Sequence, residues 1–221
     1  MVTTCRGCGS TDVRRVVDLG DQPAADHFPP VDAPGPDPRW PLELWLCNAC
    51  TLVQLGPVEP RLPEPPLAIE SATSLAHAER SVKEILAEHP HLPGATVCEF
   101  ASHHGGSWLD HLAAAGCRQA RDGERARLVV DVHGLAHEPA PGAALRGRVD
   151  RLAPDGLLVL EFHHLLPLRE GNQFDTIRHG HWSYLSLGAL DRLAYALGVT
   201  VTDVHRVPLF GGSLRLTLRP G

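Results

Sequence analysis

The feature that most constrains the fold of this 221-residue chain is a pair of C-x2-C motifs near its N-terminus. Each motif presents two thiolates at a spacing that suits tetrahedral zinc, and the four sulfur ligands are Cys5, Cys8, Cys47 and Cys50. Two disulfides or free thiols are the alternative, but a chain with no export signal is expected to keep its cysteines reduced. Four cysteines leave zinc no open coordination position. We therefore predict a structural zinc ion that holds the fold together and does not catalyse.

The zinc ligands define a small N-terminal zinc-binding module, which we place at residues 1–60, with short strands expected at 13–19 and 42–46. The proline-rich segment PVEPRLPEPP (57–66) follows. Fixed φ angles and missing amide donors make such a segment a stiff, extended linker. We place the main domain at residues 67–221.

Charge and hydropathy exclude several classes of function. The net charge is −6 and the basic residues are scattered, so no face for nucleic acid is expected. No apolar run reaches the roughly 18 residues that a membrane span needs, and the first residues lack the pattern of a signal peptide. We therefore expect a cytoplasmic protein that acts without nucleic acid or membrane.

Strands and helices alternate through the main domain, which predicts an α/β fold. A helix at 74–88 precedes a buried strand at 96–100, a glycine-bearing turn and a helix closed by Gly116. That order is typical of the first βα unit of a dinucleotide-binding sheet. The other expected strands are 126–134, 157–162, 199–207 and 213–218, and the other expected helices are 143–152 and 187–197. Together they predict a mostly parallel, Rossmann-like sheet that ends in an antiparallel edge pair.

Several motifs, in order along the chain, resemble the zinc-binding sugar C-methyltransferases, which use S-adenosylmethionine to methylate a nucleotide-linked deoxy-4-ketosugar beside its keto group. They are CRGCGS, VVDLGDQPAADHF, LWLCNACTLVQL, LAPDGLLVLEFHHLLPLREGNQFDTIRHGHWSYLSL and GGSLRL. The resemblance implies a zinc module, a Rossmann-like methyltransferase domain and a further C-terminal domain.

Four departures from the family pattern bear on its chemistry. The cofactor loop resembling E-x-x-S-N-D-G reads EFASHHG (99–105) here. Only residues 118–125 separate the first helix from the next long strand, so the step whose acidic residue would grip the cofactor's ribose is expected to be deleted. The chain stops at Gly221, short of the C-terminal domain. The family's Y-H-E-H segment reads RHGH (178–181), and its H-G-G-S reads FGGS (210–213).

Histidines gather where strands end, which is where Rossmann-type sheets bind ligands. The resemblance places His181 as the base that removes the proton beside the keto group, and His137 as a second catalytic residue. We expect His179 and Tyr184 to assist them. The predicted substrate-binding residues are His163, His164, His103, His104, Arg178 and Trp182. A second metal, held by the His-x-His pair with His103 or His163, is an alternative use of these imidazoles.

These departures lead to the expectation of a divergent enzyme that works without S-adenosylmethionine. It would have no cofactor-binding residues and would carry out histidine acid/base chemistry of the isomerase, cyclase or lyase type. The expected substrate is a small carbonyl-containing intermediate of bacterial natural-product biosynthesis. Two alternatives remain open. One is a C-methyltransferase whose cofactor pocket is rebuilt, for example by the partner in a homodimer, and the other is a non-catalytic pseudoenzyme that binds a partner.

Overall fold

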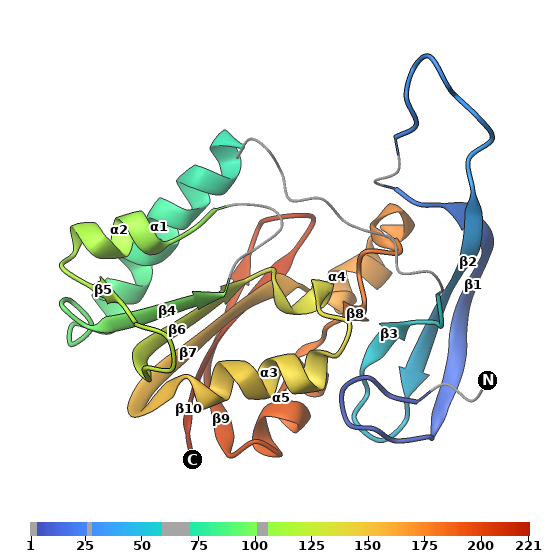
Figure 1. The fold of residues 1–221 in the computed structure, drawn as a ribbon. Coiled ribbons are helices and arrows are strands. Elements are labelled where there is room, and N and C mark those ends of the chain that lie inside the picture. The colour runs from blue at the N-terminus through green and yellow to red at the C-terminus, as the bar shows by residue number, and fades with distance from the viewer. Residues whose placement is uncertain (1–3, 26–27, 59–70, 101–105) are drawn as a thin grey trace.

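The computed structural model describes residues 4–25, 28–58, 71–100 and 106–221, which form two β-sheets (Figure 1). The larger sheet has six strands, in the spatial order β5-β4-β6-β7-β10-β9. Its first four strands run parallel, and β10 pairs antiparallel with both β7 and β9. The bounds are β4 (Thr96–Phe100), β5 (Arg118–Gln119), β6 (Ala126–Val132), β7 (Leu152–His163), β9 (Val199–Val207) and β10 (Ser213–Pro220). The expected Rossmann-like α/β class and its antiparallel edge pair are confirmed.

Helices cover both faces of this sheet, because side chains on buried strands alternate between two apolar surfaces (Figure 1). Helices α1 (Ala72–Glu88) and α2 (Leu109–Ala114) pack on one face, where Leu128 and Val130 of β6 meet Val82 and Ile85 of α1. Helices α3 (Pro141–Asp150) and α5 (Leu187–Tyr195) pack on the other face, against residues that include Val129. The connections contain the short helices η1 (Leu135–His137), α4 (Leu165–Glu170) and η2 (Phe174–Thr176).

The zinc-binding module carries the second sheet, with strand order β1-β2-β3-β8. Strands β1 (Val13–Pro23), β2 (Arg39–Cys47) and β3 (Val53–Leu55) come from the module, but β8 (Ser183–Tyr184) belongs to the main domain by sequence. In the pairing of β3 with β8, Val53 is opposite Tyr184 and Gln54 is opposite Ser183. The module and the main domain are therefore joined by a shared sheet, which the two ranges predicted from the sequence did not anticipate.

The predicted deletion after α2 is only partly right. Strand β5 is present, with two residues, and pairs parallel with β4 through Thr96–Arg118 and Val97–Gln119. The chain then turns directly into β6, so the step is shortened and not lost. The predicted linker lies largely outside the described residues. Across the described part of the chain, none of the helices has the length and apolar character that a membrane span requires.

Candidate functional site

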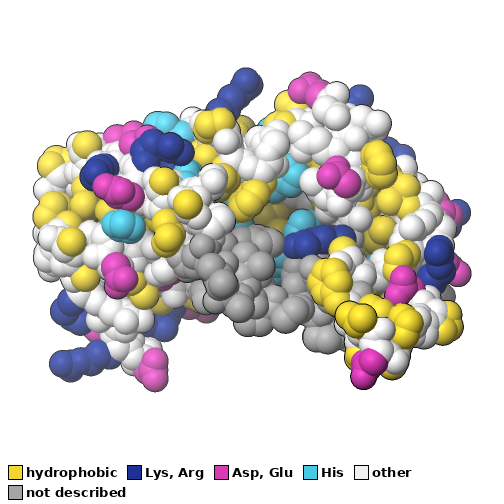
Figure 2. Space-filling model, turned by 90° about the horizontal axis from the view of Figure 1, so that it is seen from above, with side chains coloured by type: hydrophobic (Ala, Val, Ile, Leu, Met, Phe, Trp, Pro, Cys, Tyr) yellow, Lys and Arg dark blue, Asp and Glu magenta, His cyan; other side chains and the backbone are white. Residues whose placement is uncertain are grey.

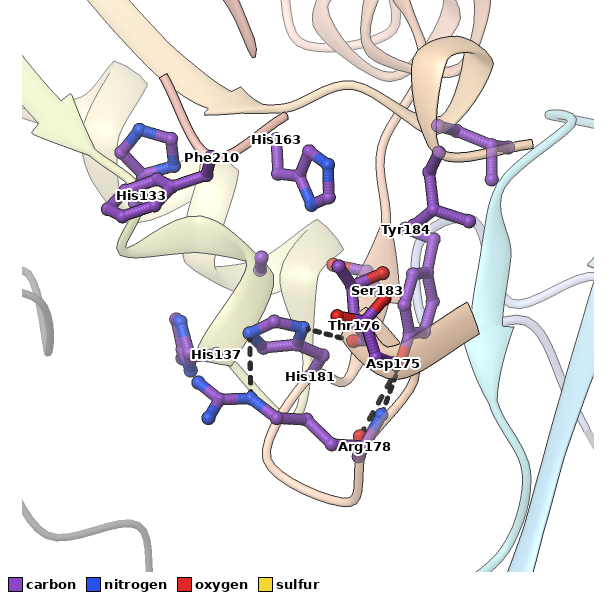
Figure 3. A pocket seen from close by; sticks show the side chains of 13 residues that line it. His133, His137, His163, Asp175, Thr176, Arg178, His181, Ser183, Tyr184 and Phe210 are labelled. Atoms are coloured by element: carbon purple, nitrogen blue, oxygen red, sulfur yellow. Dashed lines mark hydrogen bonds between the residues drawn. The ribbon is translucent and has the colours of Figure 1, made fainter. Parts of the chain in front are cut away.

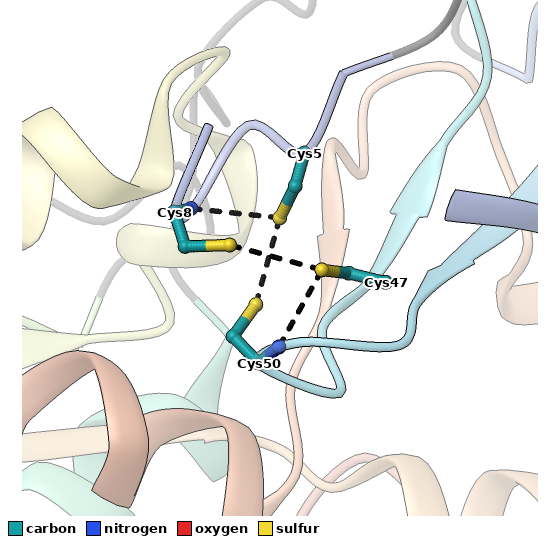
Figure 4. Close-up of side chains that lie close together, drawn as sticks. All are labelled: Cys5, Cys8, Cys47 and Cys50. Carbon is teal, nitrogen blue, oxygen red and sulfur yellow. Dashed lines mark hydrogen bonds between the residues drawn. The ribbon is translucent and has the colours of Figure 1, made fainter. Parts of the chain in front are cut away.

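The four predicted zinc ligands come together in one cluster (Figure 4). The sulfur atoms of Cys5 and Cys50 are 3.5 Å apart, and those of Cys8 and Cys47 are 3.7 Å apart. Four sulfurs at about 2.3 Å from a central zinc would lie roughly 3.8 Å from one another, whereas a disulfide needs about 2.0 Å. The donor set and its spacing therefore fit a closed tetrahedral zinc site.

Backbone amides orient these sulfur atoms. The N–H of Cys8 donates to the sulfur of Cys5 at 3.5 Å, and the N–H of Cys50 donates to the sulfur of Cys47 at 3.4 Å. The hydrogen bond between Cys5 and Cys50 lowers the pKa of Cys5 to about 5 and raises the pKa of Cys50. Zinc binding would displace the thiol protons, because the thiolate is the form of cysteine that ligates the metal.

A second site is a pocket of about 240 Å³ beyond the carboxyl ends of β6 and β7 (Figure 3). Figure 2 shows histidine and basic side chains at a hollow between the two halves of the molecule. Of the predicted site residues, the pocket brings together His137, His163, Arg178, His181 and Tyr184. The other polar residues that line it are His133, Asp175, Thr176 and Ser183.

The contacts of His181 define its tautomer. Its Nδ1 lies 3.0 Å from the carbonyl oxygen of Thr176, and its Nε2 accepts a hydrogen bond of 3.1 Å from Nε of Arg178. A carbonyl can only accept, so Nδ1 carries the proton and Nε2 carries the lone pair. His181 is therefore a neutral imidazole whose basic nitrogen is held by Arg178, and the dashed lines of Figure 3 mark both contacts.

His137 faces His181 across the pocket, with ring centroids 4.8 Å apart and the rings nearly perpendicular. It ends η1, whose start is fixed by a buried carboxylate. Asp131 accepts hydrogen bonds from the N–H groups of Gly134 and Leu135 and pairs with Arg148 at 2.5 Å. The turn after β6 is thus held by a buried ion pair, which explains how a surface loop can present His137 in a defined position.

The pocket also contains His133, one of the histidines at the ends of the predicted strands, to which we assigned no role. Its backbone φ is +60°, an uncommon value for a residue other than glycine, and its Nε2 lies 3.4 Å from Oε1 of Glu161. Glu161 is fully buried and also pairs with His77 at 2.5 Å and with Arg215 at 3.1 Å. Burial acts to raise the pKa of Glu161, but its hydrogen bonds with His133 and His77 hold it below the usual range. The sequence signal for this contact was a histidine, His133, directly after one buried strand, together with an acidic residue, Glu161, inside the next strand.

Three predicted pocket residues lie elsewhere, and those predictions are corrected. His179 is buried against the zinc-binding module, with its Nε2 3.3 Å from the carbonyl oxygen of Pro41. Trp182 packs under the guanidinium of Arg6, 4.7 Å from its ring centroid. His164 precedes α4 and lines a different cavity. For His179 and Trp182 the physical reason is that the segment between η2 and β8 passes between the pocket and the zinc-binding module, and its side chains divide between the two. His164 lies on another segment, directly before α4.

His103 and His104 lie outside the described residues, which leaves their predicted role untested. His163 lies in the pocket, 3.3 Å from Oε1 of Gln173, and burial lowers its pKa. His179 and His181 do not share a site. Among the described residues, the groups that could hold a metal are the four cysteines and an exposed trio of Glu88, Asp203 and His205. The alternative of a second metal at the His-x-His pair thus has no support from the described residues.

Comparison with known proteins finds one matching family model and one similar curated protein. Residues 5–61 match a family model described as "Putative zinc binding domain". The C-methyltransferase NovU of Streptomyces niveus is 32% identical over 261 residues, an alignment that covers 99% of this chain and 61% of the relative. The chain therefore spans about three fifths of this relative's length.

Solved structures resemble the main domain at lower identity. The PH0226 protein from Pyrococcus horikoshii OT3 has a TM-score of 0.53 and 13% identity, covering 70% of this chain and 94% of that one. A 1,6-didemethyltoxoflavin-N1-methyltransferase from Burkholderia thailandensis, solved with its substrate and S-adenosylhomocysteine, has a TM-score of 0.49 and 19% identity over 76% of this chain and 95% of its own.

These findings correct the expected chemistry. The expectation of an isomerase, cyclase or lyase that works without S-adenosylmethionine is wrong, because the relative that matches nearly the whole chain is a C-methyltransferase. The error was to take the shortening of the step that contains β5 as evidence that the protein no longer binds the cofactor. The resemblance expected from the sequence is confirmed, since residues 5–61 match the model of a zinc-binding domain and the chain is similar to a C-methyltransferase over 99% of its length.

Proposed function

We propose that this chain is an S-adenosylmethionine-dependent C-methyltransferase that acts on a carbon next to a carbonyl group. The observation that carries the proposal is the tautomer of His181, which has its lone pair on Nε2 inside the pocket. Methylation at carbon requires a carbon nucleophile, and removal of a proton beside a carbonyl generates one. Histidine suits that proton transfer at neutral pH, because the unperturbed pKa of the residue type is about 6.5.

In this proposal His181 takes the proton and His137 acts on the oxygen. The C–H electron pair moves toward the carbonyl, and the resulting enolate oxygen needs a donor close by. The ring of His137, 4.8 Å from that of His181, is placed for this role. The tight pairing of Asp131 and Arg148 behind η1 supplies the rigidity that such positioning requires.

Tyr184 acts in this scheme as a positioning residue. Its hydroxyl accepts a hydrogen bond of 3.1 Å from the backbone N–H of Arg178 and lies 3.4 Å from the carbonyl oxygen of the same residue. Both contacts are to the backbone of the loop that carries His181. Tyr184 therefore stabilises that loop, and its own strand β8 ties the loop to the zinc-binding module.

The methyl donor would supply an electrophilic methyl group, and the described residues fit it in part. Glu99, at the end of β4, organises the start of α2 by accepting hydrogen bonds from Ser107 Oγ at 2.6 Å and from the N–H of Trp108 at 2.7 Å. This crevice is where Rossmann-type sheets bind ligands. On the side where the ribose of the cofactor would lie, β5 ends at Gln119. The family has an acidic residue at the end of this strand, and its contact with the ribose is not reproduced at that position.

Calorimetric titration with S-adenosylmethionine and S-adenosylhomocysteine tests the proposal. We expect heat of binding from the wild-type chain and weaker binding by Glu99→Gln, which removes the carboxylate charge that accepts hydrogen bonds from Ser107 and Trp108. Glu79→Gln, on the exposed face of α1, is the matched control and should bind as wild type does. Absence of binding heat with both compounds at millimolar concentration would refute the methyltransferase proposal.

A further inference from the structure

We propose that a groove between the zinc-binding module and α4 binds a small amphipathic acid. The apolar body of this ligand lies against the sheet of the module, and its acidic group is held by Arg14 and Arg169. This module groove has a volume of about 670 Å³, within the roughly 300–1,000 Å³ of sites for small organic ligands. It is a cavity other than the histidine pocket, so the inference does not depend on the proposed methyl transfer.

One wall of the module groove is a face of the four-stranded sheet that is apolar except for one arginine. Residues directly opposite each other in an antiparallel pair share a face of the sheet. Val17 is opposite Leu44, and Val53 is opposite Leu46, two positions further along β2. Arg14 is also opposite Leu46, so its side chain shares this apolar face. All five residues line the groove, and Arg14 therefore brings a cation to an apolar cavity.

Strand β1 is irregular where it lines the groove. Arg15 is opposite Trp45 and Val17 is opposite Leu44, so Val16 is the extra residue of a β-bulge. Neighbours in a regular strand point to opposite faces, but Val16 and Val17 both line the groove. Val16 is 39% exposed, which places an apolar side chain at the mouth of the groove. The bulge therefore adds apolar surface on the side where a ligand enters.

The opposite wall is formed by α4 and the residues that follow it, which lie beside the module in Figure 1. Leu168 and Ile177 are buried there, in the same apolar cluster as Leu44. Phe174 also lines the groove, but it is 63% exposed. Both walls thus continue from a packed apolar base to apolar side chains in contact with water. Covering such side chains with an apolar ligand is favourable, because it removes apolar surface from water.

The charged side chains that line the groove are both positive. Arg169, at the end of α4, joins Arg14, and no acidic side chain is among the described residues of the lining. Arg15, on the other face of β1, pairs with Asp18 at 2.9 Å and with Glu43 at 2.6 Å. Within the described residues, by contrast, neither Arg14 nor Arg169 forms an ion pair. In a chain of net charge −6, two such guanidinium groups at an apolar cavity favour a carboxylate or another acidic group on the ligand.

Fluorescence of anilinonaphthalene sulfonate tests the groove on the full, zinc-loaded chain. This probe is an aromatic anion whose emission rises in apolar surroundings, and the folded, zinc-loaded state excludes the signal of a molten core. Octanoate and octanol then compete with the bound probe, since they share one alkyl chain and differ in charge. We expect a saturable rise in emission from the wild-type chain, and displacement by octanoate at a lower concentration than by octanol.

The first pair of variants locates the bound probe. Val16→Glu adds a carboxylate at the mouth of the groove. It should weaken binding of the probe and of octanoate by about tenfold or more, because an anionic ligand would have to desolvate a like charge. Val204→Glu makes the same change on β9, where the valine is 40% exposed, and should bind as wild type does. Both positions are exposed, so both variants are expected to fold, which circular dichroism checks.

The second pair of variants tests the charge. Arg14→Gln should weaken binding of octanoate by about threefold, the effect of one exposed charge, and should leave binding of octanol unchanged. Arg15→Gln makes the same change on the other face of β1 and should leave both affinities unchanged. The double variant Arg14→Gln/Arg169→Gln should weaken octanoate by about tenfold. A purely structural effect of these arginines would weaken octanoate and octanol equally.

The outcomes are distinct. Tighter binding of octanoate than of octanol, lost in the double arginine variant, supports the proposal. The proposal is overturned if the wild-type chain binds no probe, if Val16→Glu binds it as tightly as Val204→Glu, or if octanol competes as well as octanoate. A wild-type dimer that Val16→Glu separates, with probe binding unchanged, would assign the groove to a second copy of the chain instead. Binding of S-adenosylmethionine is measured separately by the calorimetric titration, so either proposal can fail without the other.

Discussion

Glu161→Gln should destabilise the protein strongly, because Glu161 is the common partner of three buried cations or potential cations. Its carboxylate is 2.5 Å from His77 Nε2, 3.4 Å from His133 Nε2 and 3.1 Å from Nε of Arg215. The side chains of Glu161 and Arg215 are 0% and 3% exposed. Removing one partner of a buried ion pair costs about 3–5 kcal/mol, because it leaves an uncompensated charge. Arg215 keeps Glu84 at 2.8 Å, so we expect the lower end, about 3 kcal/mol.

Thermal unfolding of the zinc-loaded chain measures this effect. For a chain of this length, about 3 kcal/mol corresponds to a fall in Tm of roughly 6–12 °C. Glu84→Gln removes the other carboxylate of Arg215, but its side chain is 47% exposed, so it should cost less than about 1 kcal/mol. If Glu161→Gln unfolded within about 2 °C of wild type, the view of Glu161 as the charge that organises the core would be wrong.

Three further predictions concern the zinc site, a close contact and pH. Cys47→Ser should lower bound zinc from one ion per chain toward zero by atomic absorption, whereas Cys98→Ser in β4 should keep it. In Gly142→Ala the added carbon would lie 2.0 Å from the carbonyl oxygen of Gly7, so α3 and the first C-x2-C motif must separate. We expect the free energy of unfolding, measured in urea, to fall by about 1–3 kcal/mol. Burial lowers the pKa of His163, so the unfolded chain takes up a proton that the folded state excludes. Stability from this group is complete above about pH 6.5 and falls as the pH falls, and His163→Gln should show a smaller loss of Tm on acidification.

Features determined by nearby residues could be predicted from the sequence. The spacing of the four cysteines was sufficient to group them, because each C-x2-C turn fixes its own pair. Strands β4 and β9 have the expected bounds, 96–100 and 199–207, because glycine, proline or charged turns interrupt the apolar pattern on either side. Local signals of this kind do not depend on which distant segment becomes the partner.

Features determined by distant contacts could not be predicted. In α1 the apolar Leu75 is 47% exposed, whereas the polar His77 and Ser81 are buried. Both polar side chains turn inward because Glu161 and Arg215 on the central strands need partners. The hydropathy of α1 does not reveal this, since the requirement comes from residues 80 or more positions away.

The loop between η2 and β8, residues 177–182, shows the same limit. Arg178 and His181 point into the pocket, but His179 and Trp182 point to the zinc-binding module. No periodic pattern in the sequence separates these two pairs. The division follows from β8, a strand of two residues whose partner, β3, lies about 130 positions earlier in the chain.

In the proposed function, the shared sheet would give the zinc site an indirect part in placing His181. The N–H of Leu55 donates to the carbonyl of Trp182 at 3.0 Å, and Val53 pairs with Tyr184, so β3 holds the loop that carries His181. Strand β3 in turn begins three residues after the ligand Cys50. Zinc that fixes the positions of the cysteines would therefore also fix β3, the strand against which Tyr184 and the backbone of Arg178 are placed. A closed metal site can thus determine the position of the proposed base, His181, because the strand next to the cysteines and the strand next to His181 are hydrogen-bonded neighbours.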